Sequence, residues 1–133
     1  MVDVNLLSYL LIKGPQTKAA ERAYARDRRW ISPRLHRYEF LNVLSSNCRF
    51  HGMSRDHAMA LWKRANRIIP GFSTEPDPLE VLKTFITLSL TTYDSEYVVL
   101  AQMRKLRLVT SDKDVLKALP DIAVSIEDFA SGK

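Results

Sequence analysis

The stretch LRLVTSDKD, residues 106–114, decides the fold class of this chain. Leu106–Thr110 is apolar and predicts a short buried strand, and Lys113–Leu119 predicts a helix directly after it. Strands that alternate with helices are typical of a parallel sheet covered on both faces. Asp112 lies at the junction, beyond the carboxyl end of the strand and before the helix. Ligands in such folds bind at this edge of the sheet.

The rest of the chain predicts helices joined by three further short strands. Strands are expected at Met1–Asp3, Trp30–Ser32 and Ile122–Ser125. Helices are expected at Asn5–Ile12, at Lys18–Arg28 with Thr17 as its cap, from Pro33 to about His51, at Arg55–Ile69 with Ser54 as its cap, at Leu79–Ser89 and at Thr92–Lys105. Pro70 to Pro78 holds three prolines and predicts a loop. We therefore expect a single helix-rich α/β domain over residues 1–133 with a small, mostly parallel sheet.

The composition is that of an ordinary globular domain with a basic surplus. The 133 residues are 46% hydrophobic and 26% charged, with a net charge of +5. The first 66 residues carry 12 basic and 5 acidic side chains, and the remainder carry 8 and 10. Such an excess favours polyanionic partners. Cys48 is the only cysteine, so no internal disulfide can form, and no apolar run is long enough to span a bilayer. Leu6–Ile12 lacks the flanks of a signal peptide, so we expect a cytoplasmic protein.

Four carboxylates occupy positions where a charge is unfavourable: Asp3, Glu39, Asp94 and Asp112. Asp3 closes the first predicted strand, and Asp94 lies in the first turn of a helix. Glu39 shares the inward stripe of its helix with Leu35 and Val43. Burying an ionised carboxylate without a partner costs several kcal/mol. If the four converge in space, a divalent cation is their natural partner.

Each acid also has a purely structural interpretation. Asp3 and Asp112 could cap the helices that follow them. Asp94 could favour a helix dipole, with Thr91 or Thr92 as the cap. Glu39 could pair with an arginine. Because four independent coincidences are needed, the shared site is the stronger hypothesis.

The residue types favour hydrolysis of a phosphodiester at a metal site. Oxygen ligands select hard cations such as Mg²⁺ or Mn²⁺ over Zn²⁺. The three histidines lack the spacing of zinc ligands, and the four glycines are scattered, so there is no Gly-rich phosphate loop. One or two cations could activate water and stabilise charge on a scissile phosphate without a nucleophilic side chain. The pattern therefore indicates a metal-dependent nuclease.

These residues, in this order, resemble the PIN domain, and especially the VapC-type toxins of toxin–antitoxin pairs. Asp3-Val-Asn5 is similar to the family's opening Asp-x-Ser/Asn, and Tyr38-Glu39 to its helical acid. Residues 92–101 (TYDSEYVVLA) are similar to its Tyr-Asp-x-x-Tyr-x-x-x-Ala stretch. Residues 108–114 (LVTSDKD) are similar to its Leu-Val-Thr-x-Asp. The match covers essentially the whole chain, and the last two stretches are the most specific.

The resemblance implies a three-layer α/β/α domain and a Mg²⁺- or Mn²⁺-dependent ribonuclease that cuts single-stranded RNA. It implies that Asp3, Glu39, Asp94 and Asp112 are the catalytic metal ligands. Asn5 and Thr110 would orient them through hydrogen bonds, and Asp114 would be an auxiliary acid. It also implies a homodimer and an antitoxin protein that occupies the active-site groove.

Arginines and aromatic residues gather just before Glu39. Residues 26–37 hold five arginines, and Arg28, Arg29, Arg34 and Arg37 are candidates for binding RNA. Alternatively, Trp30 and Tyr38 belong to the core and the arginines form an ordinary solvated face. Two other functions stay open. One is a catalytically silent PIN-like module that binds RNA or a protein; the other is a metal-dependent phosphatase or DNA nuclease that uses the same acids.

Overall fold

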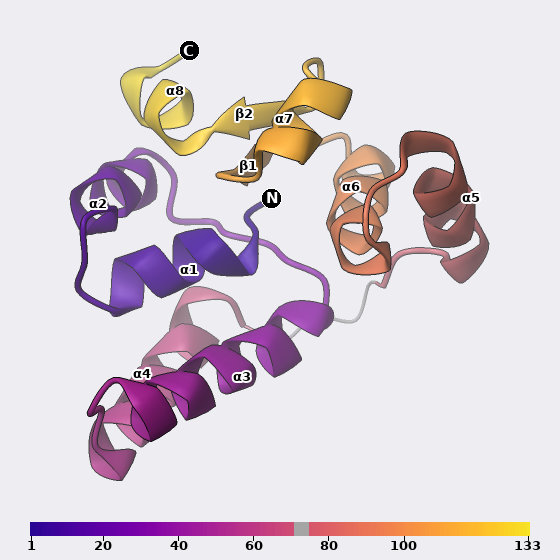
Figure 1. Cartoon of the computed structure of the whole chain (residues 1–133). Coiled ribbons are helices and arrows are strands. Elements are labelled where there is room, and N and C mark those ends of the chain that lie inside the picture. Colours follow the sequence, from indigo (N-terminus) through magenta and orange to yellow (C-terminus); the bar gives the residue numbers. More distant parts are fainter. Residues whose placement is uncertain (71–74) are drawn as a thin grey trace.

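A computed structural model describes residues 1–70 and 75–133, which form mostly helices (Figure 1). In chain order the elements are α1 (Val4–Leu11), α2 (Thr17–Arg26), α3 (Leu35–Phe50), α4 (Arg55–Ile68), α5 (Pro78–Leu88), α6 (Thr92–Arg104), β1 (Leu108–Thr110), α7 (Lys113–Ala118), β2 (Ala123–Ser125) and α8 (Ile126–Ser131). Every helix predicted from the sequence is present, with ends that differ by two residues at most. Only α8 was not predicted.

The sheet is smaller than the sequence predicted. β1 and β2 pair in parallel, with Val109 opposite Val124. The N-terminal segment lies along the other edge of β1, but Val2 makes only an isolated parallel bridge with Val109. The main-chain N–H of Val109 donates to the carbonyl of Met1 at 2.9 Å, and that of Asp3 donates to Val109 at 3.4 Å. The predicted strand at Met1–Asp3 is thus reduced to one bridge that still anchors Asp3 beside β1.

The predicted strand at Trp30–Ser32 is wrong, although this segment does approach the N-terminal segment. The N–H of Val2 donates to the carbonyl of Ile31 at 3.0 Å, and the hydroxyl of Ser32 donates to the carbonyl of Val2 at 2.6 Å. One of these two bonds comes from a side chain, so no regular ladder forms. Pro33 follows directly and has no N–H with which to extend one.

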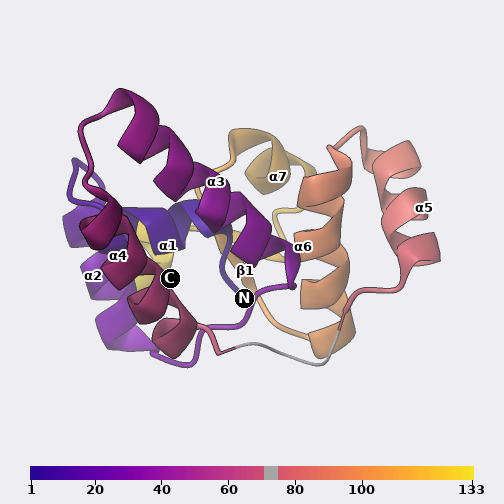
Figure 2. The same cartoon turned by 90° about the horizontal axis from the view of Figure 1, so that it is seen from below.

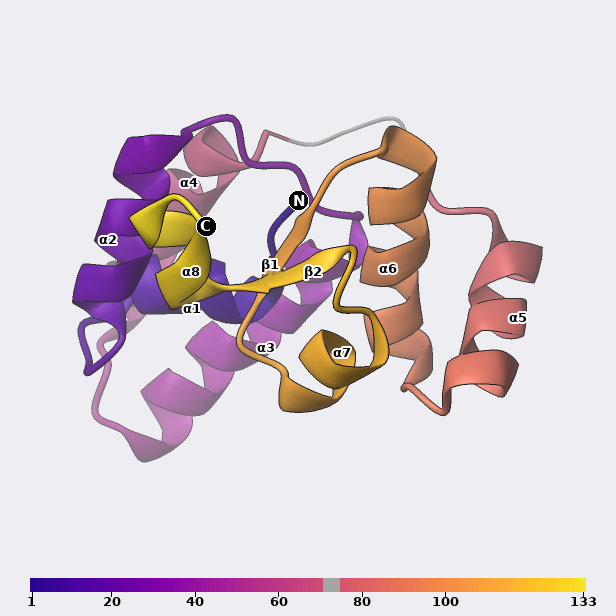
Figure 3. The same cartoon turned by 90° about the horizontal axis from the view of Figure 1, so that it is seen from above.

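Side chains that alternate along the strands divide the core into two layers. Val109 and Val124 face a cluster that includes Val2 and apolar residues of α1, α2 and α4. Leu108 and Ala123 face a second cluster with residues of α6 and α7. Figure 3 shows β1 and β2 between α2 and α8 on one side and α6 on the other. Helices therefore cover both faces of a small parallel sheet, which confirms the predicted α/β class.

Polar side chains fix the beginnings of most helices. Asp3, Ser54, Asp77, Thr91, Asp112 and Ser125 each accept a main-chain N–H as an N-cap. The predicted Thr17 cap is wrong: Gln16 precedes α2 without a side-chain bond, and Thr17 is the first helical residue. The Thr17 hydroxyl instead accepts the N–H of Gly14 at 2.9 Å, which closes the turn before the helix.

The loop predicted at Pro70 to Pro78 is shorter than expected at its end, because Pro78 is the first residue of α5. Residues 71–74 lie outside the described residues. α4 and α5, on either side of this loop, lie at opposite ends of the molecule (Figure 2). Among the helices of the described ranges, none combines the length and the apolar character that crossing a bilayer requires.

Candidate functional site

All four predicted acids line one small pocket of about 110 Å³. They reach it from four places in the fold: the start of α1, the second turn of α3, the first turn of α6 and the start of α7. The complete lining is Asp3, Val4, Asn5, Glu39, Asp94, Tyr97, Leu108, Thr110, Asp112 and Val115. Residues separated by more than a hundred positions are thus brought to the carboxyl edge of β1.

Asp3 is the most enclosed of the acids, with 8% of its surface exposed. Its Oδ1 accepts the N–H of Leu6 at 2.9 Å, and its Oδ2 accepts the hydroxyl of Thr110 at 2.6 Å. Burial raises the pKa of Asp3 above its usual value, these hydrogen bonds oppose the rise, and the charge of Asp112 adds to it. Asp3 therefore caps α1, as one interpretation held, and also faces the pocket.

Glu39 is held by a tyrosine from the opposite helix. The hydroxyl of Tyr97 in α6 donates to Oε1 of Glu39 in α3 at 2.6 Å. Burial is the main cause that raises the pKa of Glu39; the Tyr97 hydroxyl lowers it, and the charges of Asp3 and Asp94 raise it again. The pKa of Tyr97 is raised by its own burial and by the Glu39 charge, so the phenol stays a donor. No arginine is needed to explain the position of Glu39.

Asp112 and Thr110 form a short chain of bonds at the end of β1. The N–H of Asp112 donates to the hydroxyl oxygen of Thr110 at 3.0 Å, and that hydroxyl donates onward to Asp3. Oδ1 of Asp112 accepts the N–H groups of Asp114 and Val115 at 2.8 and 3.1 Å, which caps α7. Thr110 thus holds two of the acids in register, the supporting role expected of it.

Asp94 is tied to the residue that caps its own helix. The hydroxyl of Thr91 donates to Oδ2 of Asp94 at 2.7 Å, and the N–H of Asp94 donates back to that hydroxyl at 3.0 Å. This reciprocal arrangement fixes the first turn of α6. Asp94 therefore serves the helix start and the pocket together.

Of the two remaining predicted site residues, one lines the pocket and the other does not. Asn5 lines the pocket, whereas Asp114 is exposed and does not line it. Tyr97 was missed as a site residue although it belongs to the Tyr-Asp-x-x-Tyr stretch. The available signal was its spacing, since a residue three positions after Asp94 in a helix lies on the same side of it.

The four carboxylates have the chemistry of ligands for a hard cation, but their oxygens are not spaced as ligands of one ion. Four carboxylates in one pocket supply oxygen ligands of the kind that Mg²⁺ and Mn²⁺ accept. In the described ranges, however, no three Asp, Glu, His or Cys side chains are arranged to hold a metal ion. Each acid is instead bonded to its own helix start or to a hydroxyl, and the charges repel one another. The residue types fit a divalent cation, and binding one would require these side chains to rotate toward a common centre.

The four predicted RNA-binding arginines each have a partner within the chain. Arg29 pairs with Asp27 at 3.2 Å, and Arg34 lies 3.8 Å from Glu75. Arg28 lies over the ring of Tyr24, and Arg37 over that of Trp62. Trp30 is buried in the core with 4% of its surface exposed, whereas Tyr38 is 66% exposed. The core interpretation is thus correct for Trp30 and wrong for Tyr38.

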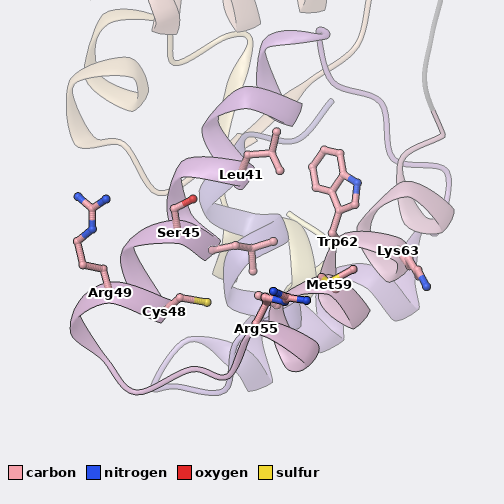
Figure 4. A pocket seen from close by; sticks show the side chains of 10 residues that line it. Leu41, Ser45, Cys48, Arg49, Arg55, Met59, Trp62 and Lys63 are labelled. Carbon is pink, nitrogen blue, oxygen red and sulfur yellow. The ribbon is translucent and has the colours of Figure 1, made fainter.

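A larger hollow of about 630 Å³ lies between α3 and α4, and none of the four acids lines it (Figure 4). Its walls are mainly apolar, and its charged residues are all basic. The lining is Leu41, Leu44, Ser45, Cys48, Arg49, Arg55, Ala58, Met59, Trp62 and Lys63. This hollow therefore lacks the carboxylate oxygens that a hard divalent cation prefers, and the four acids line the smaller pocket instead.

Comparisons with known proteins concern the family and the fold. A family model described as "PIN domain" matches residues 1–121. The crystal structure of PAE2754 from Pyrobaculum aerophilum is similar in fold, with a TM-score of 0.73 at 24% identity. That similarity covers 98% of this chain and 92% of the other. A search of curated proteins found no match.

Proposed function

The chain belongs to the PIN domain family, and from this premise we propose that it is a Mg²⁺- or Mn²⁺-dependent endoribonuclease of single-stranded RNA. PIN domains are generally nucleases and typically use divalent metals. The observation that carries the proposal is the pocket lined by Asp3, Glu39, Asp94 and Asp112. A cytoplasmic location, where RNA is present, is part of the same proposal.

In this proposal the four carboxylates hold the cation, and neighbouring hydroxyls hold the carboxylates. A bound divalent cation supplies activation of water and neutralisation of charge on the phosphate. Thr110 keeps Asp3 and the main chain of Asp112 together, and Tyr97 keeps Glu39 turned toward the pocket. Such supporting hydrogen bonds orient ligands and are worth roughly 10- to 100-fold in metal affinity or activity.

The purified chain, incubated with single-stranded RNA and matched single-stranded DNA, tests the proposal. We expect cleavage of the RNA in Mg²⁺ or Mn²⁺ and none in EDTA. Preferential cleavage of DNA would instead support a DNA nuclease with the same acids. Binding of RNA without cleavage in any divalent cation would support a catalytically silent PIN-like module.

We further propose that the nuclease is the toxin of a toxin–antitoxin pair and that an acidic, amphipathic helix of the antitoxin docks between α3 and α4. The groove there offers apolar walls from Leu41, Met59 and Trp62, and its charged residues Arg49, Arg55 and Lys63 are all basic. An apolar stripe flanked by Asp and Glu complements it in shape and charge. From this groove, the rest of the antitoxin could extend to the acidic pocket on the far side of α3.

Met59→Glu is expected to abolish inhibition by the antitoxin while the chain keeps its toxicity. Met59 is 52% exposed in the groove, so a glutamate there is tolerated by the fold but repels an acidic helix. Met103→Glu on α6 is a matched control, because Met103 is 49% exposed. Co-expression with the small protein encoded beside this chain should relieve the growth arrest caused by the wild type and by Met103→Glu, but not that caused by Met59→Glu. Relief that is equal in Met59→Glu would contradict docking in this groove.

We also propose that two copies of the chain pair through α5. This helix packs on α6 and leaves Leu79, Leu82 and Ile86 exposed by 68%, 53% and 68%. Glu80 and Lys83 on the same helix pair with each other at 2.9 Å and so add little net charge that two copies would have to bring together. A symmetric pairing would bury the same apolar stripe on both copies. Light scattering after size-exclusion chromatography should give twice the chain mass of 15.3 kDa. A mass of one chain at micromolar concentration would contradict the pairing.

A further inference from the structure

Two largely exposed tyrosines directly precede acids of the pocket, although neither belongs to its lining. Tyr38 is 66% exposed and directly precedes Glu39 in α3; Tyr93 is 62% exposed and directly precedes Asp94 in α6. The other large exposed aromatic residues in the described ranges are Phe50, eleven residues after Glu39 in α3, and Phe85, on α5, which carries none of these acids. Single exposed apolar side chains are common. Two aromatic rings that both adjoin pocket acids need a more specific explanation.

The two rings come from helices that meet at the pocket. α3 and α6 are joined there by the 2.6 Å bond between the Tyr97 hydroxyl and Glu39. Consecutive Cα atoms are about 3.8 Å apart, so each tyrosine begins beside a carboxylate that lines the pocket. Tyr93 lies one helical turn before Tyr97, on the same stripe of α6. Tyr38 turns away from the buried stripe formed by His36, Phe40 and Leu44.

The faces of both rings are available to a ligand. Elsewhere in the described residues, arginines cover aromatic rings: Arg28 covers Tyr24, Arg37 covers Trp62 and Arg49 covers Phe50. No ring stacking or cation–π contact in those ranges involves Tyr38 or Tyr93. Each ring therefore keeps a flat apolar face open to the solvent beside the acids.

We propose that Tyr38 and Tyr93 stack on two unpaired bases, one on each side of the phosphate that enters the acidic pocket; this rests on the nuclease function proposed above. Aromatic side chains bind bases of single strands in this way with little sequence preference. Bases inside a duplex are already stacked on each other and cannot offer their faces. The pair of tyrosines thus selects a single-stranded segment at the cut and sets which backbone position reaches the acids.

Binding of a short, fluorescently labelled RNA in EDTA tests the stacking apart from catalysis. We expect Tyr38→Ala and Tyr93→Ala each to weaken binding of the single strand by roughly tenfold, the usual loss for one stacked base. Tyr38→Phe and Tyr93→Phe should bind as the wild type does, because stacking needs the ring and not the hydroxyl. Phe50→Ala is the matched control, since Phe50 is 71% exposed on the same helix as Tyr38 and should not contribute.

An abasic nucleotide identifies the stacked bases. Placed beside the cut site, it should weaken wild-type binding about as much as one tyrosine substitution does. The wild type and the corresponding Ala variant should then bind this RNA equally, because the substitution and the abasic nucleotide each remove one partner of the same stacking contact. An equal loss in single-stranded and duplex RNA, or an equal loss with Phe50→Ala, would overturn the proposal.

The outcomes for the stacking and for the nuclease are distinguishable. Tyrosine-dependent binding without cleavage in Mg²⁺ or Mn²⁺ supports the stacking and contradicts the nuclease. Cleavage and binding that are unchanged in both Ala variants contradict the stacking alone. A wild-type chain that neither binds nor cleaves RNA contradicts both, and a protein ligand would then be the better explanation of the exposed rings.

Discussion

Glu39→Gln is expected to lower the rate of metal-dependent RNA cleavage by at least about a hundredfold and to leave the fold intact. Glutamine keeps the carbonyl oxygen that accepts the hydroxyl of Tyr97, so the contact between α3 and α6 survives. It removes the negative charge, and a neutral amide is a far weaker ligand for a hard cation than a carboxylate. Asp94→Asn should have a similar effect, because its Oδ2 bond to Thr91 is replaceable by an amide.

Single-turnover cleavage of labelled RNA in saturating Mn²⁺ measures this loss, and circular dichroism checks the fold. Glu21→Gln is a matched control: it makes the same chemical change on the exposed surface of α2, at a residue that does not line the pocket. It should cleave as the wild type does. Cleavage by Glu39→Gln at a rate within threefold of the wild type would remove Glu39 from the site.

Much of the fold follows from local sequence signals. Proline, glycine and capping residues mark the helix ends well, because each acts through the backbone of its own neighbourhood. α8 was missed because it begins at Ile126, directly after β2 and with no loop to mark the change, although Ser125 and Asp128 form a reciprocal cap with bonds of 2.9 and 3.1 Å. The strand at Trp30–Ser32 failed because strand pairing depends on distant residues: this segment makes two hydrogen bonds to Val2, from Ile31 and Ser32, and no regular ladder.

The members of the candidate site were more predictable than its geometry. Carboxylates at the junctions of strands and helices are visible in the sequence, and the fold brings the four to one pocket. The hydrogen bonds that orient these carboxylates depend on partners far along the chain, such as Thr110 for Asp3 and Tyr97 for Glu39. Structural and functional interpretations also turned out not to exclude each other. Asp3 and Asp112 cap helices and line the pocket at once.

The pocket should make the metal-free protein less stable as pH rises, and a divalent cation should reverse this. The pKa values of Asp3 and Glu39 are raised above their ordinary values, chiefly by burial. Their contribution to the free energy of unfolding is therefore fully present below their unfolded pKa values of about 4. It is lost as the pH rises through the raised folded values, because ionising a buried carboxylate then costs energy.

Differences between variants isolate this effect from other titrating groups. Burial lowers the pKa of His36, and this group removes stability as the pH falls, so the wild-type curve alone is ambiguous. His36 is present in both the wild type and Glu39→Gln. Its contribution therefore cancels when the melting temperature of one is subtracted from that of the other at each pH. We expect metal-free Glu39→Gln to melt a few degrees above the wild type at pH 8 and to lose that advantage toward pH 4.

A divalent cation changes the sign of this comparison. Because the ligands must be ionised to bind it, metal affinity rises with pH. At a concentration of one hundred times Kd, binding adds about 2.7 kcal/mol to the free energy of unfolding, which corresponds to a rise of about 10 °C for a chain of this size. Thermal unfolding at pH 8 should therefore place the wild type above Glu39→Gln in Mn²⁺ and below it in EDTA. Two variants that keep the same order in both buffers would contradict cation binding by Glu39, since only a ligand held by this carboxylate can convert the cost of its ionisation into stability.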